Sequence, residues 1–500
     1  MKTRHDYYAI LGVNSDASLE DIKAAYRHAA RRFHPDANSN PGAAAHFRDI
    51  AEAYSTLGDT SARANYDLAL TREGLPPPYF SLRVTPSKRA LKTLQEPQVI
   101  YALVEIIPDA QYVSVEQQDA ALNLALVIDR STSMKGPRLE RVKQAAHRII
   151  ENLGPNDILS VVSFSDRAEV VFPATPVIER ATLKAMSSTM QASGGTEIFQ
   201  GLRAGVRELR RSIHPRYVNH LILLTDGQTY GDEDKCLELA EEVAQEGIGI
   251  SAVGIGQEWN DKFLDELASK TGGSSTYINS PSAIVTFLNQ KIRSLGAAFA
   301  ERLTLSVAPD PDVTLEYAFR LTPSPQPLPL DVQTIPLGTL EKNRPINAIL
   351  QLQMPALPEE NFRSVLRLDA TGDIMRAEYR GFKAVTDLSI EVSNSVSQEN
   401  PPMPILDALG KLTLYRMQER AQEAIARGNI QEATRRLQNL ATRLLENGQE
   451  TLAHAAIAEA HRVARTTMLS EEGQKTLKYG TRALLLAPPA STDGSTEDET

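Results

Sequence analysis

The spacing of apolar residues changes several times along the chain, and each change marks a different kind of segment. Between Asp21 and Phe33 the apolar positions recur every three to four residues, and the segment from Phe47 to Leu57 repeats this spacing. This period predicts two amphipathic helices that can pack against each other. His34 precedes Pro35, and because a residue before proline is disfavoured in the helical region, the first helix is expected to end there.

A nearly continuous apolar run from Leu122 to Ile128 predicts a different element, a strand buried on both faces of a parallel sheet. A second such run, from Val218 to Thr225, ends in Asp226 as the first ends in Asp129. In open parallel sheets, ligands bind outside the carboxyl ends of the strands, where the strand order reverses. We therefore expect the two aspartates to meet at one edge of an α/β domain.

Short segments of β type stand on both sides of this α/β segment, separated by proline-rich turns. They cover Phe80 to Thr85, Val99 to Ile107, Leu303 to Val307, Val313 to Phe319, Ile346 to Met354, Val365 to Leu368 and Leu388 to Val392. The earlier part offers too few strands to cover an apolar face, because isolated hairpins are marginal in water. The pattern thus predicts one β-sandwich, 80–118 plus 300–395, with the α/β domain, 119–297, inserted between its strands.

The other segments are inferred from composition and period. Three successive prolines predict a stiff linker over 71–79. Helical spacing returns over 403–487, where Ala424 to Leu437 match half of a tetratricopeptide repeat; no full period of about thirty-four residues follows, which favours a plain helical bundle. The acidic end, 488–500, lacks large apolar residues and predicts a disordered tail.

Composition narrows the class of protein. The 500 residues suffice for roughly three or four domains of common size. Cys236 is the only cysteine, so no intrachain disulfide is possible, and its helical surroundings favour a small buried side chain over a nucleophile. The net charge of −10 argues against a nucleic-acid partner. Because the chain has no cleavable signal and no apolar run of membrane-spanning length, we expect no membrane partner and a cytoplasmic location.

Side chains with oxygen atoms follow the first buried strand. The spacing Asp129-x-Ser131-x-Ser133 brings a carboxylate and two hydroxyls round one side of a turn, Thr196 follows two glycines, and Asp226 follows the second strand. Hard oxygen ligands without Cys or His suit Mg²⁺, Mn²⁺ or Ca²⁺ rather than zinc. Such a set leaves a coordination position for an incoming group, which a carboxylate of another protein would fit.

These residues resemble the metal-ion-dependent adhesion site of the von Willebrand factor type A (vWA) family. The resemblance runs from about Ala121 to Gly296 and includes Val161 to Asp166 and Val253 to Gly256. It implies a doubly wound, Rossmann-like fold. It also implies that five residues bind the ion, directly or through water: Asp129, Ser131, Ser133, Thr196 and Asp226.

Two other interpretations compete with metal-dependent binding. The sole role of Asp129 and the two serines could be to cap the helix that begins near Pro137. Capping, however, would not require the later threonine and aspartate. Asp129 could also be the phosphoryl-accepting nucleophile of a phosphohydrolase. Such hydrolases need a second aspartate two residues on, where this chain has Ser131, and no G-x-S-x-G, Walker or H-E-x-x-H motif occurs. We therefore expect no enzymatic activity.

A second signature lies between the two N-terminal helices, where the tripeptide His34-Pro35-Asp36 stands in their loop. Three basic residues recur every four positions and form one stripe on the outer face of the first helix: Lys23, Arg27 and Arg31. A basic stripe by itself is usually a solvated helix face. Beside the tripeptide it favours a docking surface.

The N-terminal segment resembles a J-domain, the module through which co-chaperones stimulate ATP hydrolysis by DnaK-type chaperones. The match covers residues 5–69 of an expected domain 1–70 and includes Asp6 to Val13, Ala25 to Arg27 and Ala62 to Asp67. The resemblance implies that the tripeptide triggers the partner's ATPase and that the basic stripe docks on an acidic face. Charge complementarity of this kind sets encounter rate and orientation more than affinity.

Together these patterns predict a helical J-domain, a doubly wound vWA domain inserted in a β-sandwich, and a C-terminal helical bundle. We expect a co-chaperone that stimulates a DnaK-type ATPase and binds a protein client or assembly partner through Mg²⁺, or through Mn²⁺ or Ca²⁺. A metal-dependent scaffold whose J-like module serves only for interaction stays open as the alternative. No Gly/Phe-rich linker and no Cys-rich repeat follow the J-like segment, so client binding must come from elsewhere in the chain.

Overall fold

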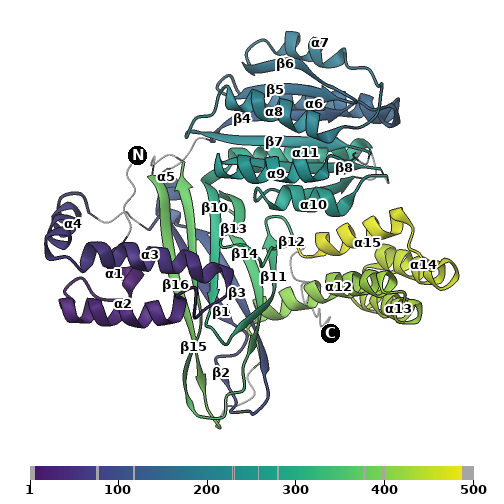
Figure 1. The fold of residues 1–500 in the computed structure, drawn as a ribbon. Helices are drawn as coiled ribbons and strands as arrows, with labels where there is room; N and C mark the ends of the chain where they lie inside the picture. The colour runs from purple at the N-terminus through teal and green to yellow at the C-terminus, as the bar shows by residue number, and fades with distance from the viewer. Residues whose placement is uncertain are drawn as a thin grey trace, which may run out of the picture. The chain divides into compact units, whose positions relative to one another are not determined.

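The computed structural model describes residues 6–74, 78–115, 119–227, 229, 231–256, 258–278, 281–375, 379–395 and 400–486 (Figure 1). The chain divides into two compact units, Met1–Arg320 with Pro327–Glu399 and Leu321–Gln326 with Asn400–Thr500. The middle of the expected linker, 75–77, and the expected tail, 488–500, lie outside the described residues.

The first unit begins with four helices, α1 (Tyr7–Leu11), α2 (Leu19–Phe33), α3 (Pro41–Leu57) and α4 (Thr60–Glu73). Ser18 and Asp21 form a capping box at the start of α2, and His34 ends this helix in an extended conformation, as expected before Pro35. Buried residues of α2 and α3, among them Ile22 and Ile50, share one core, which confirms the two expected helices. Helix α4 continues to Glu73, so it occupies the start of the expected linker.

Two five-stranded sheets form the sandwich. In sheet order, one contains β1 (Phe80–Pro86), β3 (Gln98–Pro108), β14 (Ile346–Met354), β11 (Thr314–Thr322) and β12 (Gln326–Pro327). The other contains β13 (Ile335–Glu341), β10 (Ala298–Pro309), β15 (Asn361–Ile374), β16 (Tyr379–Val392) and β2 (Ala90–Leu91). Strand β3 pairs antiparallel with β14, Ile106 opposite Ile346, so strands from both sides of the α/β segment share a sheet.

This pairing confirms the interrupted sandwich. The two ends of the inserted segment meet, because Ala120 N donates a hydrogen bond to Gly296 O at 2.8 Å. The structure also adds elements that the sequence pattern did not predict. Strand β13 contains a proline and a glycine, which weaken a strand pattern, and the short helix α5 (Ala110–Val115) follows the strands of the first half.

The inserted segment contains a six-stranded sheet in the order β6-β5-β4-β7-β8-β9. Its strands are β4 (Ala121–Asp129), β5 (Ile158–Phe164), β6 (Ala168–Pro176), β7 (Tyr217–Thr225), β8 (Ile248–Ile255) and β9 (Ser275–Ile278). Among the described strands of this sheet, only β6 runs antiparallel to its neighbour. Strand β4 lies between β5 and β7, where the strand order reverses, as expected for a doubly wound sheet.

Helices cover both faces of this sheet. They are η1 (Thr132–Met134), α6 (Pro137–Asn152), α7 (Arg180–Ser188), α8 (Ile198–Arg210), α9 (Glu233–Gln245), α10 (Asp261–Ser269) and α11 (Pro281–Gly296). Helix α8 lies against β4 so closely that a Cβ atom on Gly205 would come within 2.5 Å of Val127 Cγ2. Gly205 therefore fixes the depth at which α8 packs on the sheet.

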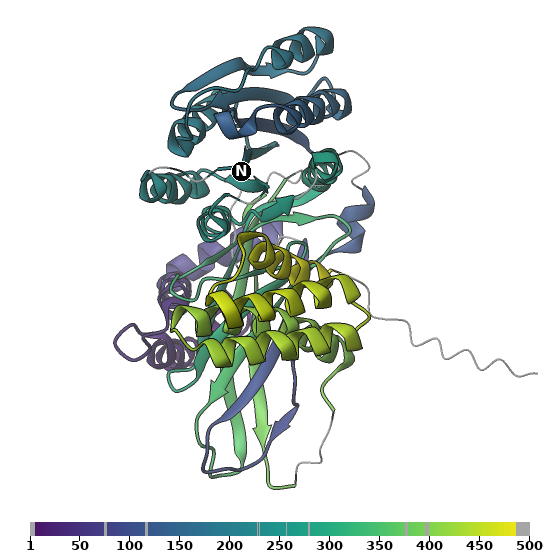
Figure 2. The same ribbon diagram turned by 90° about the vertical axis from the view of Figure 1, so that its right-hand side faces the viewer.

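The second unit contains α12 (Met403–Ala426), α13 (Ile430–Glu446), α14 (Glu450–Thr466) and α15 (Glu471–Leu484) (Figure 2). These four helices share an apolar core. This arrangement confirms the expected helical domain. Across the described part of the chain, every helix is too short or too polar to span a membrane.

Candidate functional site

Three loops meet at the carboxyl edge of the six-stranded sheet: the loop after β4, the loop before α8 and the loop after β7. Backbone hydrogen bonds join the first two, with Ser193 N donating to Arg130 O at 2.7 Å and Thr132 N donating to Gly194 O at 3.0 Å. Strands β4 and β7 are neighbours, so their final residues lie side by side. The topology thus gathers the side chains that the sequence predicted as metal ligands.

Asp129 is fully buried at the end of β4. Its Oδ1 accepts a hydrogen bond from Ser131 N at 2.8 Å, and its Oδ2 accepts one from Thr225 Oγ1 at 2.7 Å. Burial raises the pKa of Asp129, while the hydrogen bonds from Thr225 and Ser131 oppose the shift and the negative charge of Asp226 adds to it. A cation beside the two carboxylates would offset both the desolvation and the repulsion.

The two serines connect Asp129 with Asp226. Ser131 Oγ lies 2.9 Å from Ser133 Oγ, and Ser133 Oγ donates to Asp226 Oδ1 at 2.7 Å. Asp226 Oδ2 accepts a hydrogen bond from Arg138 at 2.6 Å. The Asp226 side chain is inaccessible to solvent, whereas that of Arg138 is 39% exposed.

Thr196 is buried and lies next to the loop after β7, because a Cβ atom on Gly227 would come within 3.1 Å of Thr196 Oγ1. Its loop is held by Gly195 N, which donates to Asp166 Oδ1 at 2.7 Å. The structure therefore places all five predicted residues in adjoining loops at one edge of the sheet.

This donor set fits a hard divalent cation. It combines two buried carboxylates with three hydroxyls, the oxygen ligands that Mg²⁺ and Ca²⁺ prefer. Within the described residues no three side chains from His, Cys, Asp and Glu form a metal-binding cluster. The hydroxyls of Ser131, Ser133 and Thr196 would thus have to complete any coordination by the two aspartates.

Sequence reasoning missed two members of this site. Thr225 is the last residue of β7 and donates to Asp129, but a threonine at a strand end carries no distinctive signal. Arg138 carried a usable signal, because it is the second residue of α6. A cation in the first turn of a helix opposes the helix dipole, so its presence there indicates a compensating carboxylate.

The loop after α2 forms the second candidate site. The side chains of His34 and Asp36 are 45% and 92% exposed. Asp36 N donates to His34 Nδ1 at 3.2 Å, and the His34 ring packs edge-on against Phe47. All three residues of the basic stripe are exposed on α2: Lys23, Arg27 and Arg31. The tripeptide and the stripe are accessible from solvent, as a docking surface requires.

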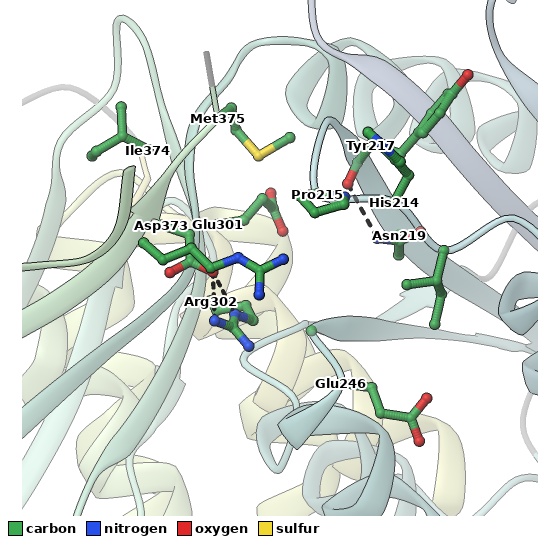
Figure 3. A pocket seen from close by; sticks show the side chains of 13 residues that line it. His214, Pro215, Tyr217, Asn219, Glu246, Glu301, Arg302, Asp373, Ile374 and Met375 are labelled. Carbon is green, nitrogen blue, oxygen red and sulfur yellow. Dashed lines mark hydrogen bonds and ion pairs between the residues drawn. The ribbon is translucent and has the colours of Figure 1, made fainter. Parts of the chain in front are cut away.

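A hollow of about 90 Å³ lies at the opposite edge of the vWA sheet, where β7 begins (Figure 3). Its walls come from the loop before β7, the turn before β8 and the sandwich strands β10 and β15. Arg302 adopts a positive φ of 51° at a bulge of β10 and holds Asp373 through a 2.7 Å hydrogen bond. Burial raises the pKa of Glu301 to about 7. The wall carries charges of both signs, and we assign no ligand to it.

Comparison with known proteins agrees with this arrangement. Three family models match: the DnaJ domain at 6–67, the von Willebrand factor type A domain at 123–290, and the Sll0103-like C-terminal alpha-helical domain at 403–487. The chain is 30% identical over 383 residues to "Uncharacterized protein sll0103" from Synechocystis sp., a match that covers 74% of this chain and 90% of that one. The chain belongs to the Sll0103-like family.

This Sll0103-like protein carries a J-domain besides the parts that define the family. Its N-terminus is 55% identical over 67 residues to the chaperone protein DnaJ of Methanosarcina acetivorans, a match that covers 13% of this chain and 18% of that DnaJ. The fusion of a J-domain with a vWA domain, expected from the sequence, is thus confirmed. The two matches support a DnaJ-like co-chaperone with a vWA interaction module.

Two solved structures share the fold of this Sll0103-like chain. The von Willebrand factor type A protein from Catenulispora acidiphila has a TM-score of 0.64 at 16% identity and covers 80% of this chain and 96% of its own. The ArnB paralog VWA2 from Sulfolobus acidocaldarius has a TM-score of 0.51 at 17% identity, with coverage of 82% and 100%. At these identities the likeness concerns the fold alone.

Proposed function

We propose that this protein is a cytoplasmic J-domain co-chaperone that stimulates a DnaK-type ATPase and binds a protein ligand through a divalent cation in its vWA domain. The observation that carries the chaperone part is the exposed tripeptide at the end of α2, next to an exposed basic stripe on the same helix. Positive charge on one helix face steers the approach of an acidic partner and fixes its orientation.

The vWA part of the proposal rests on the five oxygen side chains at the sheet edge. Asp129 and Asp226 would supply the negative charge that holds the ion, and the hydroxyls of Ser131, Ser133 and Thr196 would supply neutral oxygens. Bound there, Mg²⁺, or Mn²⁺ or Ca²⁺ in its place, would offer a coordination position to a carboxylate oxygen of the protein ligand. The chain's own residues anchor the ion and leave one side for the ligand.

Two alternatives make different demands on these residues. A scaffold that uses its J-like segment only for binding would keep the metal site but would not stimulate ATP hydrolysis. A phosphohydrolase would need an acid or base two residues after Asp129, and that position holds Ser131, whose backbone N–H donates to Asp129. The enzyme alternative therefore has less support than either binding function.

Isothermal titration of the full chain with MgCl₂ or MnCl₂ tests the metal part of the proposal. We expect saturable binding of one ion, which Asp129→Ala abolishes because the substitution removes both a ligand and a charge. Equal heats from the wild type and the variant would contradict a metal site at this edge. The chaperone part is tested by the ATPase measurement at the end of the Discussion.

A further inference from the structure

The J-domain contacts the β-sandwich backbone to backbone. Helix α3 meets strand β10 at Gly42, where a Cβ atom would lie only 2.0 Å from Val307 O. Ser306 Oγ donates to Gly42 O at 3.4 Å in the same contact. Glycine weakens a helix by roughly 0.5–1 kcal/mol relative to alanine, so the helix by itself gives no reason for Gly42. The close approach of β10 explains why a glycine stands at this position.

The loop that carries the tripeptide is tied to the same strand. Asn38 is only 2% exposed, and its Nδ2 donates both to Arg32 O at 3.0 Å and to Pro309 O at 2.9 Å. Asn40 N donates to Asn38 Oδ1 at 3.1 Å. One buried amide thus joins the end of α2, the start of α3 and the end of β10.

Charged groups surround this contact. Arg32 pairs with Asp310 and Asp387 of the sandwich, and Lys383 pairs with Asp49 of α3. Arg367 NH1 donates to Ile10 O at 3.0 Å. These pairs reach three of the four J-domain helices or their ends. Such a set of polar contacts is typical of a specific interface between two domains.

A buried pair of side chains also joins the J-domain to the sandwich. His46 Nδ1 of α3 lies 3.5 Å from Asp369 Oδ2 of β15, and both side chains are almost completely inaccessible. Burial, with the positive charge of Arg367 and Lys383, lowers the pKa of His46 to about 3. The imidazole is therefore neutral in the docked J-domain.

Docking does not bury the tripeptide or the basic stripe. His34 and Asp36 stay exposed, as do the three basic residues of α2, although Arg32 and Asn38 on either side of the tripeptide are fixed to the sandwich. Docking therefore leaves the trigger accessible. This arrangement fits a positioning role and not an inhibitory one.

We propose that the β-sandwich positions the J-domain: through Asn38 and the Gly42–Val307 contact it holds the His34-Pro35-Asp36 loop in one conformation and orientation. A DnaK-type chaperone would then engage a J-domain fixed to the sandwich and not one that moves on a tether. This inference rests on the proposed co-chaperone function and adds Asn38 and Gly42 as positioning residues.

The decisive variant is Gly42→Ala in the full chain. Alanine favours the helix but cannot fit against Val307 O, so we expect the J-domain to keep its fold and to leave the sandwich. Gly410→Ala is the matched control, because Gly410 lies in helix α12 and a Cβ atom there meets nothing within 4 Å. Asn38→Ala is the second variant, which loosens the loop without adding volume.

Docking and stimulation are measured separately. Spin labels on cysteines replacing the exposed Ala24 and Thr314 report the distance between J-domain and sandwich, since the natural Cys236 is buried. We expect a single narrow distance distribution in the labelled chain that keeps both Gly42 and Gly410, and the same distribution when Gly410→Ala is added. Gly42→Ala should give a broad distribution. In unlabelled protein, we expect Gly42→Ala and Asn38→Ala to lower the stimulation of a DnaK-type ATPase at least threefold, with Gly410→Ala unchanged.

The outcomes separate this proposal from the proposed function. A broad distance distribution in the labelled chain that keeps Gly42 overturns the docked arrangement. Unchanged or increased stimulation by an undocked Gly42→Ala overturns the positioning role alone. Absence of stimulation by the wild type, with a narrow distribution, overturns the co-chaperone function and with it this role.

Discussion

Arg138 and Asp226 form an ion pair at the candidate metal site, with 2.6 Å between the guanidinium nitrogen and the carboxylate oxygen. The arginine neutralises a carboxylate that would otherwise be buried beside Asp129 without a cation. A divalent ion bound by Asp226 would compete with this internal cation. We therefore expect Arg138 to lower the affinity of the proposed site for a divalent ion.

Replacing Arg138 with alanine should therefore tighten binding of Mg²⁺. We expect roughly a two- to fivefold lower Kd, because a partly exposed ion pair is worth about 1 kcal/mol or less. Titration calorimetry measures the change, and Arg141→Ala on the exposed face of the same helix is the control. Weaker binding in Arg138→Ala would show that the arginine supports the site and does not compete with the ion.

The variant Asp129→Asn should separate metal binding from folding. It keeps the shape of a side chain whose pKa burial raises, so the metal-free protein should melt at or above the wild-type temperature. Excess Mg²⁺ should raise Tm of the wild type, because a ligand of the folded state stabilises it, and should leave Tm of the variant unchanged. Asp157→Asn, which replaces one of the two carboxylate oxygens that accept from Leu122 N and Gly154 N at the other end of β4, should lower Tm but keep the Mg²⁺-dependent rise. An equal rise in Asp129→Asn would disprove the assigned site.

The free energy of unfolding should fall as the pH falls below about 6.5, because His220 is buried in the folded protein. This residue of β7 is buried and within 2.9 Å of Ser251 Oγ, and burial lowers its pKa well below the usual value of 6.5. Unfolding exposes the imidazole, which then binds a proton, so its contribution to stability is complete above 6.5 and is lost progressively at lower pH. The slope is at most about 1.4 kcal/mol per pH unit for this group.

Urea unfolding between pH 7.5 and 5.5 measures this slope. In His220→Gln the slope should be smaller, and in His214→Gln, where the histidine is exposed, it should equal that of the wild type. A wild-type slope that His220→Gln leaves unchanged would assign the effect to other groups.

Because β3 and β14 share a sheet, the two sequence segments of the sandwich should need each other to fold. Residues 300–395 expressed alone should lack a cooperative melt, because β1 and β3 cover part of the core and leave an open edge when removed. Joining 80–120 directly to 296–395 should restore a cooperative melt, since Ala120 and Gly296 already touch. Cooperative unfolding of 300–395 by itself would contradict the interrupted sandwich.

Much of this fold follows from local patterns in the sequence. The apolar run ending at Asp129 predicted a central buried strand, and the helical period before His34 predicted α2 and the loop after it. The contacts that tie distant segments together leave no such pattern. Asn38 bonds to Pro309 across 271 positions in the chain, and Gly42 resembles an ordinary helix start until Val307 is placed beside it. Arg138 is an intermediate case, because its position in a first helical turn was unusual but its partner Asp226 was not evident.

The steady-state ATPase rate of a purified DnaK-type chaperone, measured with the 500-residue chain and two of its variants, tests the co-chaperone function most directly. We predict stimulation by the wild type, loss of stimulation with His34→Gln, whose side chain is 45% exposed and whose replacement leaves the core intact, and full stimulation by Asp129→Ala. A folded His34→Gln variant that stimulates as well as the wild type, or a wild type that does not stimulate at all, would contradict the co-chaperone function.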